Sequence, residues 1–190
     1  MSLASLRGKV VLLTFLDPAC TTGCAVAQEF RATGQLLGAS SRDVALVAIT
    51  LSPSYRSAAV ISAFNRRERL DTVPGWLFLT GSLPQLQRVW QAYSVPAYGL
   101  SAGPATAHTG QAYVIDRAGR VRQVLNTGPG PGTAATEASF ASLLAGAARK
   151  RCAHDPGGQA PWAVSACRRV PSAKATAPDA TTARAIRPHA

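Results

Sequence analysis

The chain has 190 residues, of which 47% are hydrophobic and 15% are charged, so it can fill a core and is not a highly charged disordered chain. Its 20 Lys and Arg against 9 Asp and Glu give a formal net charge of +11, a balance that favours binding to anionic partners. The longest apolar run, 10–16 interrupted by Thr14, is far shorter than the roughly 20 residues of a membrane-spanning helix.

The positive charge is concentrated near the C-terminal end. Segment 147–190 carries eight of the basic residues and two of the acidic ones, in a sequence rich in Ala, Pro, Thr and Ser without helical or strand periodicity. Such a composition buries too little apolar surface to offset its ordering entropy, so we expect 149–190 to be a disordered basic tail. The charges are dispersed and Trp162 is the only aromatic residue there, which argues against a nucleic-acid partner.

Before this tail, buried strands alternate with amphipathic helices. Continuous apolar, β-branched runs predict the strands, and apolar residues at helical spacing predict the helices. We expect Thr21 or Thr22 to cap the first helix, and Arg66, Arg67 and Arg69 to form a basic outer face on the second. The predicted elements are strand 9–16, helix 23–37, strand 43–51, helix 57–69, strand 75–79, helix 83–93, strands 111–115 and 121–125, and helix 136–148.

This order predicts an α/β sandwich. Its central sheet would be mostly parallel with flanking helices, and the last two strands, joined by the turn 116–119, would add a C-terminal antiparallel hairpin. The same order matches the thioredoxin fold. We therefore expect one thioredoxin-like domain over 1–148, followed by the tail 149–190.

Cys20 and Cys24 stand at the junction of the first strand and the first helix. On a helix this spacing places both thiols on one face, with Cα atoms about 6 Å apart, which a disulfide allows. The helix N-terminus is expected to lower the thiol pKa and so favour the thiolate. Two adjacent thiolates can exchange disulfides or bind a soft metal, and the spacing does not choose between these.

Two further cysteines, Cys152 and Cys167, fall in the expected tail. They are open to three interpretations: a tail disulfide in an oxidising compartment, a second metal site with His154, or incidental cysteines. Neither His154 nor His189 is expected to be a ligand of the main site.

Other motifs accompany the cysteine pair in a fixed order. They are RGKVVLL at 7–13, LTGS at 79–82, WQAY at 90–93, His108, and AYVIDRAG at 112–119. Together with C-x3-C they resemble the SCO/SenC family of thioredoxin-fold copper chaperones, from about residue 6 to residue 148. Each motif alone is weak, and the combined pattern is fairly specific.

The resemblance implies that Cys20, Cys24 and His108 bind copper. Two thiolates and an imidazole suit Cu(I), and Cu(II) is left open. The implied function is a chaperone that delivers Cu(I) to the dinuclear copper site of cytochrome c oxidase, or keeps the cysteines of that site reduced. Its partners would be the copper-site subunit of that oxidase and a thiol reductant protein.

Two other functions stay open. The chain would be an enzyme if it were a thiol-disulfide oxidoreductase, with Cys20 as nucleophile and Cys24 as resolving thiol. It would be a binding module if it kept the fold and had lost both activities.

Some residues depart from the family pattern. Ala25 stands where a proline usually follows the second cysteine, and Ser52-Pro53 replaces the usual Asp-Pro, which removes a carboxylate near the site. Asp17 would oppose thiolate formation if it pointed inward.

The family resemblance also implies an extracytoplasmic, cell-membrane-associated protein. The first residues do not form a signal peptide, because Asp17 directly follows the apolar stretch and no cleavage site comes after it. We hypothesise that Met1 lies inside a longer reading frame and that membrane association depends on an N-terminal anchor missing from the chain as written.

Overall fold

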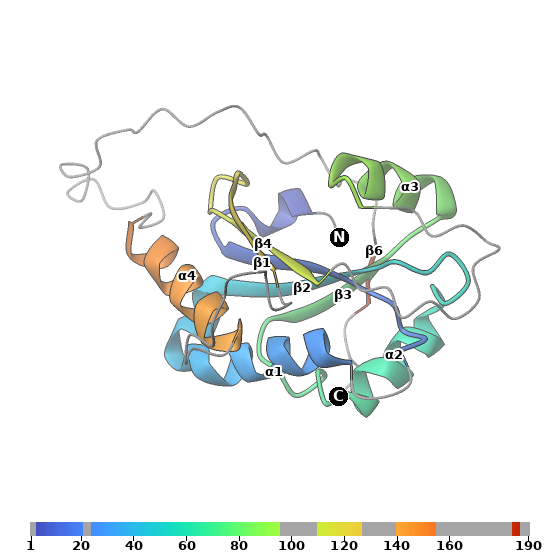
Figure 1. The fold of residues 1–190 in the computed structure, drawn as a ribbon, viewed down its shortest axis with the longest axis horizontal. Coiled ribbons are helices and arrows are strands. Elements are labelled where there is room, and N and C mark those ends of the chain that lie inside the picture. The colour runs from blue at the N-terminus through green and yellow to red at the C-terminus, as the bar shows by residue number, and fades with distance from the viewer. Residues whose placement is uncertain (1–2, 21–23, 96–109, 127–139, 155–183, 187–190) are drawn as a thin grey trace.

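The computed structural model describes residues 3–20, 24–95, 110–126, 140–154 and 184–186. A six-stranded mixed sheet lies at its centre, in the order β5-β4-β1-β2-β3-β6 (Figure 1). Parallel pairing joins β1 (Val10–Leu16), β2 (Val44–Thr50) and β3 (Trp76–Thr80). Antiparallel pairing adds β4 (Gln111–Ile115) to β1, β5 (Val121–Asn126) to β4, and β6 (Arg184–Ile186) to β3.

Helices cover both faces of this sheet. Figure 1 shows α1 (Ala25–Leu37), α2 (Ala58–Arg67) and α4 (Phe140–His154) on the lower face, and η1 (Leu3–Leu6) and α3 (Leu83–Ala92) on the upper. Right-handed crossovers that step in one direction, from β1 to β2 to β3, place α1 and α2 on the same face. The predicted α/β sandwich with flanking helices and a C-terminal hairpin is confirmed.

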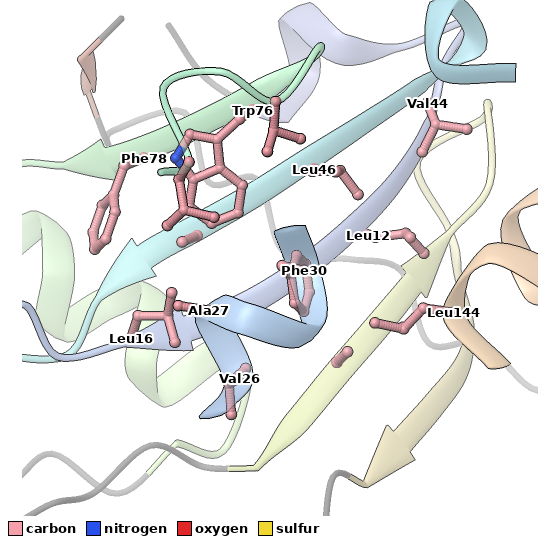
Figure 2. Close-up of a cluster of buried hydrophobic side chains, with 14 of the residues drawn as sticks. Leu12, Leu16, Val26, Ala27, Phe30, Val44, Leu46, Trp76, Phe78 and Leu144 are labelled. Carbon is pink, nitrogen blue, oxygen red and sulfur yellow. The ribbon is translucent and has the colours of Figure 1, made fainter. Parts of the chain in front are cut away.

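The three parallel strands are buried along their whole length, which explains their unbroken apolar sequences. One core cluster lies under α1, α2 and α4, and a second lies under α3 and η1. Figure 2 shows Phe30 pointing from α1 toward the sheet, with Leu12 and Leu46 around it and Leu144 contributed by α4. The Phe30 ring also contacts Trp76 edge-on, with 6.1 Å between ring centroids.

Polar contacts bind α1 to α4. The Glu29 carboxylate accepts a hydrogen bond of 2.8 Å from the Ala141 N–H, one of the unpaired donors at the start of α4. At the other end of the interface, the Arg149 guanidinium donates to the Leu36 carbonyl. The two helices are therefore fixed to each other at both ends of their contact.

Two features differ from the expectations. Helix α1 begins at Ala25 with Cys24 as its N-cap, so a threonine is not the cap, and Thr21 and Thr22 lie outside the described residues. Helix α4 continues to His154, because Ala148 is buried and Cys152 packs against the core. Residues 184–186 form β6, so parts of the segment expected to be disordered are ordered. The division into a domain and a tail stays a prediction.

No helix within the described ranges is long and apolar enough to cross a membrane.

Replacement of Phe30 by alanine tests the α1 packing. Because Phe30 is fully buried, Phe30→Ala should lower the free energy of unfolding by about 3 to 5 kcal/mol, through lost burial and the cavity left behind. Leu36→Ala, on the exposed side of the same helix, is the control and should change it by less than about 1 kcal/mol. Urea unfolding followed by circular dichroism measures both, and equal losses would contradict this packing.

Candidate functional site

The candidate site lies where β1 ends and the chain turns into α1. In this turn the Cys20 N–H donates to the Asp17 carbonyl at 3.1 Å, and the Ala19 N–H donates to the Asp17 carboxylate at 2.9 Å. Asp17 therefore closes its own turn, a usual role for aspartate in loops. The carboxyl ends of the parallel strands meet at this edge of the sheet, where α/β proteins commonly bind ligands.

The two cysteines occupy different structural positions. Cys24 is fully buried at the N-cap of α1, whereas Cys20 precedes the helix, is half-buried and packs against the same core. The prediction that both lie on one helical face is therefore wrong. The Cys20 thiol is still close enough to help raise the pKa of Cys24, and both are free thiols.

Burial dominates the electrostatics of Cys24. The pKa of the Cys24 thiol is raised from 9.0 to about 12, chiefly by burial, with smaller contributions from the neighbouring Cys20 thiol and the Glu68 carboxylate. The Ala27 N–H opposes this rise, although the side chain makes no capping hydrogen bond. The expectation that the helix N-terminus favours the Cys24 thiolate is wrong, because desolvation of the charged form outweighs the helix end.

A polar cluster that the sequence analysis missed lies beside the thiols. The Glu68 carboxylate, 3% exposed, accepts hydrogen bonds from Arg67 Nε at 3.0 Å and Gln28 Nε2 at 2.6 Å. The Arg67 guanidinium also donates to the Cys20 carbonyl, and it lies 5.2 Å from the centre of the Phe64 ring. The expected basic outer face therefore holds only in part, since Arg67 turns toward the site.

The only signal for this cluster in the sequence is one acidic residue within the run Arg66-Arg67-Glu68-Arg69. Periodicity predicts that this run continues helix 57–69 with a basic outer face. Helix α2 ends one residue before Glu68, whose N–H donates to the Phe64 carbonyl and turns the carboxylate inward.

His108 lies outside the described residues, as do Cys167 and His189. Within the described ranges, no group of three or more His, Cys, Asp or Glu side chains could hold a metal ion. Cys152 is half-buried on α4, and burial raises its pKa, partly offset by the nearby Arg117 guanidinium.

The comparison with known proteins gives the family. The model of the SCO1/SenC family matches residues 1–140, which is more than half of the chain. The chain belongs to the SCO1/SenC family. No curated protein matches the sequence significantly.

Solved structures in the same family share this fold at low sequence identity. Copper-bound ScoI from Bradyrhizobium japonicum is 20% identical, with 78% of this chain and 88% of that chain covered and a TM-score of 0.60. A SCO1/SenC family lipoprotein from Bacillus anthracis is also 20% identical, covers 78% and 84%, and has a TM-score of 0.56. BsSco, described as a Sco-family cytochrome c oxidase assembly protein with a disulfide switch, is 23% identical, covers 66% and 74%, and has a TM-score of 0.52.

The structure accommodates the residues that depart from the SCO1/SenC pattern. Ala25 occupies the first helical position without interrupting α1. Ser52 closes the loop after β2, where its Oγ accepts from the Tyr55 N–H at 3.3 Å and its N–H donates to Thr50 Oγ1. The carboxylate that acts on Cys24 belongs to Glu68, which lies just beyond α2.

Replacement of Glu68 by glutamine tests the charge around Cys24. We expect about a tenth of Cys24 to be ionised at pH 11 in the wild type, given a pKa of about 12. Glu68→Gln should increase this fraction, because removal of the negative charge lowers the pKa. The ¹³Cβ shift of labelled cysteine, assigned with Cys24→Ser, follows the titration, and circular dichroism checks the fold at each pH.

Asp71→Asn is the matched control for this titration. It removes a carboxylate three residues along the chain that does not contribute to the raised pKa of Cys24, so the titration should stay unchanged. A Cys24 midpoint at or below pH 9 in the wild type would contradict the burial argument.

Proposed function

We propose that this SCO1/SenC protein binds copper through Cys20, Cys24 and His108 and serves the assembly of cytochrome c oxidase. The observation that carries the proposal is the proximity of two free thiols beyond the carboxyl end of β1. Thiolates prefer Cu(I) to harder ions. Copper bound in the B. japonicum ScoI structure and the oxidase-assembly role given for BsSco support the same function here.

The sheet register supports His108 as the third ligand. Strand β4 runs antiparallel to β1 with Ala112 opposite Thr14, so β4 begins at the edge where β1 ends. The Thr14 hydroxyl fixes this arrangement by donating to the Gln111 carbonyl at 2.8 Å. His108 precedes Gln111 by three residues, within about 10 Å along an extended chain. Cys20 follows the same end of β1.

Copper uptake at this site carries a proton cost. A metal ligand must be the thiolate, so Cu(I) has to displace the proton that burial keeps on Cys24. More specifically, we propose that the protein delivers Cu(I) to the dinuclear copper site of the oxidase, or reduces the cysteines of that site. The same two thiols serve both tasks, because the reduced pair binds metal and the oxidised pair does not.

An anaerobic Cu(I) titration against a chelator of known affinity tests the three-ligand site. The reduced wild-type protein should bind one Cu(I), and Cys20→Ala, Cys24→Ala and His108→Ala should each lose stoichiometric binding. Cys152→Ala and His154→Ala are matched controls that should bind like the wild type. Unchanged binding in His108→Ala would exclude the three-ligand site.

A thiol-disulfide oxidoreductase is the second candidate, favoured by the proximity of the two thiols. In that reaction Cys20, the more exposed of the two, would attack a substrate disulfide and Cys24 would resolve the mixed disulfide. If the wild type binds no Cu(I) but reduces a disulfide substrate in a Cys20-dependent manner, this function replaces the copper role. If the protein neither binds Cu(I) nor reduces a disulfide, the remaining interpretation is a binding module.

We also propose that the protein acts outside the cytoplasm in association with the cell membrane, where the copper-site subunit of the oxidase and a thiol reductant would be its partners. A lipoprotein among the similar SCO1/SenC structures supports this location. Cells that express the native gene with a C-terminal tag should show the protein in the membrane fraction and accessible to external protease. Recovery in the cytosolic fraction would contradict the proposal.

A further inference from the structure

We infer that Arg67, Glu68 and Gln28 are positioning residues that hold the Cys20 turn against the Cys24 end of α1. The inference rests on the proposed use of the two thiols. It assigns a role to a polar cluster that lies outside the three proposed copper ligands.

A continuous series of hydrogen bonds joins the carbonyls of the two cysteines. The Arg67 guanidinium donates to the Cys20 carbonyl, and its Nε donates to Glu68 Oε1. On the other carboxylate oxygen, Glu68 accepts from the Gln28 side chain. The Gln28 N–H in turn donates to the Cys24 carbonyl at 3.0 Å. The series thus connects the turn after β1, the chain beyond α2, and the first turn of α1.

The cluster is specific in its chemistry. A carboxylate as buried as that of Glu68 requires hydrogen-bonding partners, and Arg67 and Gln28 occupy both of its oxygens. A guanidinium can serve the carboxylate and the Cys20 carbonyl at once because it presents several N–H donors in a fixed plane. The Phe64 ring beneath Arg67 further limits where that plane can lie.

The cluster acts on the site through geometry. Cys24 is fixed by its place at the helix start and by full burial, whereas Cys20 stands in a turn outside the helix. The contact from Arg67 restricts that turn, which raises the effective concentration of the Cys20 thiol at the Cys24 thiol. Removal of the contact should therefore weaken any reaction or complex that needs both sulfurs together.

The equilibrium between the dithiol and its disulfide measures this effect without copper. The Cys20 and Cys24 thiols lose two electrons and two protons and form one S–S bond, while one glutathione disulfide accepts them and becomes two glutathione molecules. The full chain carrying Cys152→Ser and Cys167→Ser, titrated with glutathione mixtures, gives the equilibrium constant from the fraction of free thiol. Circular dichroism establishes that each variant is folded.

In Arg67→Ala the equilibrium constant for disulfide formation should fall about tenfold, equivalent to about 30 mV. Arg66→Ala is the matched control, since it removes the same charge from an exposed neighbouring position on α2, and it should stay within about twofold of the parent. If Arg67→Ala and Arg66→Ala give the same constant as the parent, the inference is wrong.

Arg67→Lys keeps the test decisive if Arg67→Ala does not fold. It retains the charge and the aliphatic stem, but its single nitrogen cannot replace the two guanidinium nitrogens that donate to Glu68 and Cys20. The constant should fall in this variant as well, and a value equal to that of the parent would overturn the inference.

Cu(I) titrations of the same variants separate this inference from the proposed function. If the wild type fails to bind Cu(I), the proposed copper function fails, while the disulfide equilibrium still decides the role of Arg67. If the wild type and Arg67→Ala bind Cu(I) equally and share one disulfide constant, the positioning role fails and the copper function stands.

Discussion

Burial of Cys24 at the N-cap of α1 is the constraint on which the rest of the site depends. A sulfur with no exposed surface keeps its proton at neutral pH, because the charged form would lose its hydration. Burial also means that any group that reacts with the Cys24 sulfur, or coordinates a metal together with it, must approach from the loops beyond the strand ends. The partner sulfur on Cys20, set in a turn with part of its surface exposed, is the group that meets this requirement.

A buried negative charge lies beside this neutral thiol. Glu68 has a negative charge close enough to Cys24 to disfavour the thiolate, yet its carboxylate is completely occupied by Arg67 and Gln28. An unpaired carboxylate in this place would cost several kcal/mol in desolvation, whereas a hydrogen-bonded one is tolerated. The hydrogen bonds that stabilise the Glu68 charge also connect the chain segments that carry the two cysteines. The same contacts therefore stabilise the buried charge and the geometry of the site.

The fold was predictable because its signals are local and repeated. The buried parallel strands are continuous apolar runs, and residues such as Ile61 and Phe64 recur at helical spacing, so the element boundaries differ from those expected by only a few residues in most cases. Helix α4 was predicted too short because its charged end, Arg149 to Arg151, was assigned by composition to the tail. Packing of Cys152 against the core overrides that composition.

The site was predictable in its residues and less so in its physics. The C-x3-C spacing identified both thiols, but spacing does not specify that Cys24 is the N-cap and Cys20 lies before the helix. The pKa of Cys24 follows from the depth of burial, which is a property of the assembled core. Glu68 could not be assigned, since its contacts with Gln28 depend on how α1 and α2 pack, and the two residues are 40 positions apart.

The attachment of α1 to α4 has a consequence for motion at this end of the molecule. Because Glu29 binds the start of α4 and Leu36 accepts from Arg149, α1 cannot slide along the sheet without breaking polar contacts at both ends of a packed interface. The helix therefore behaves as a rigid support that presents Cys24 at a fixed height above the strands. Cys20 lies outside this fixed helix, and the hydrogen bond from the Arg67 guanidinium to its carbonyl attaches it instead to the end of α2.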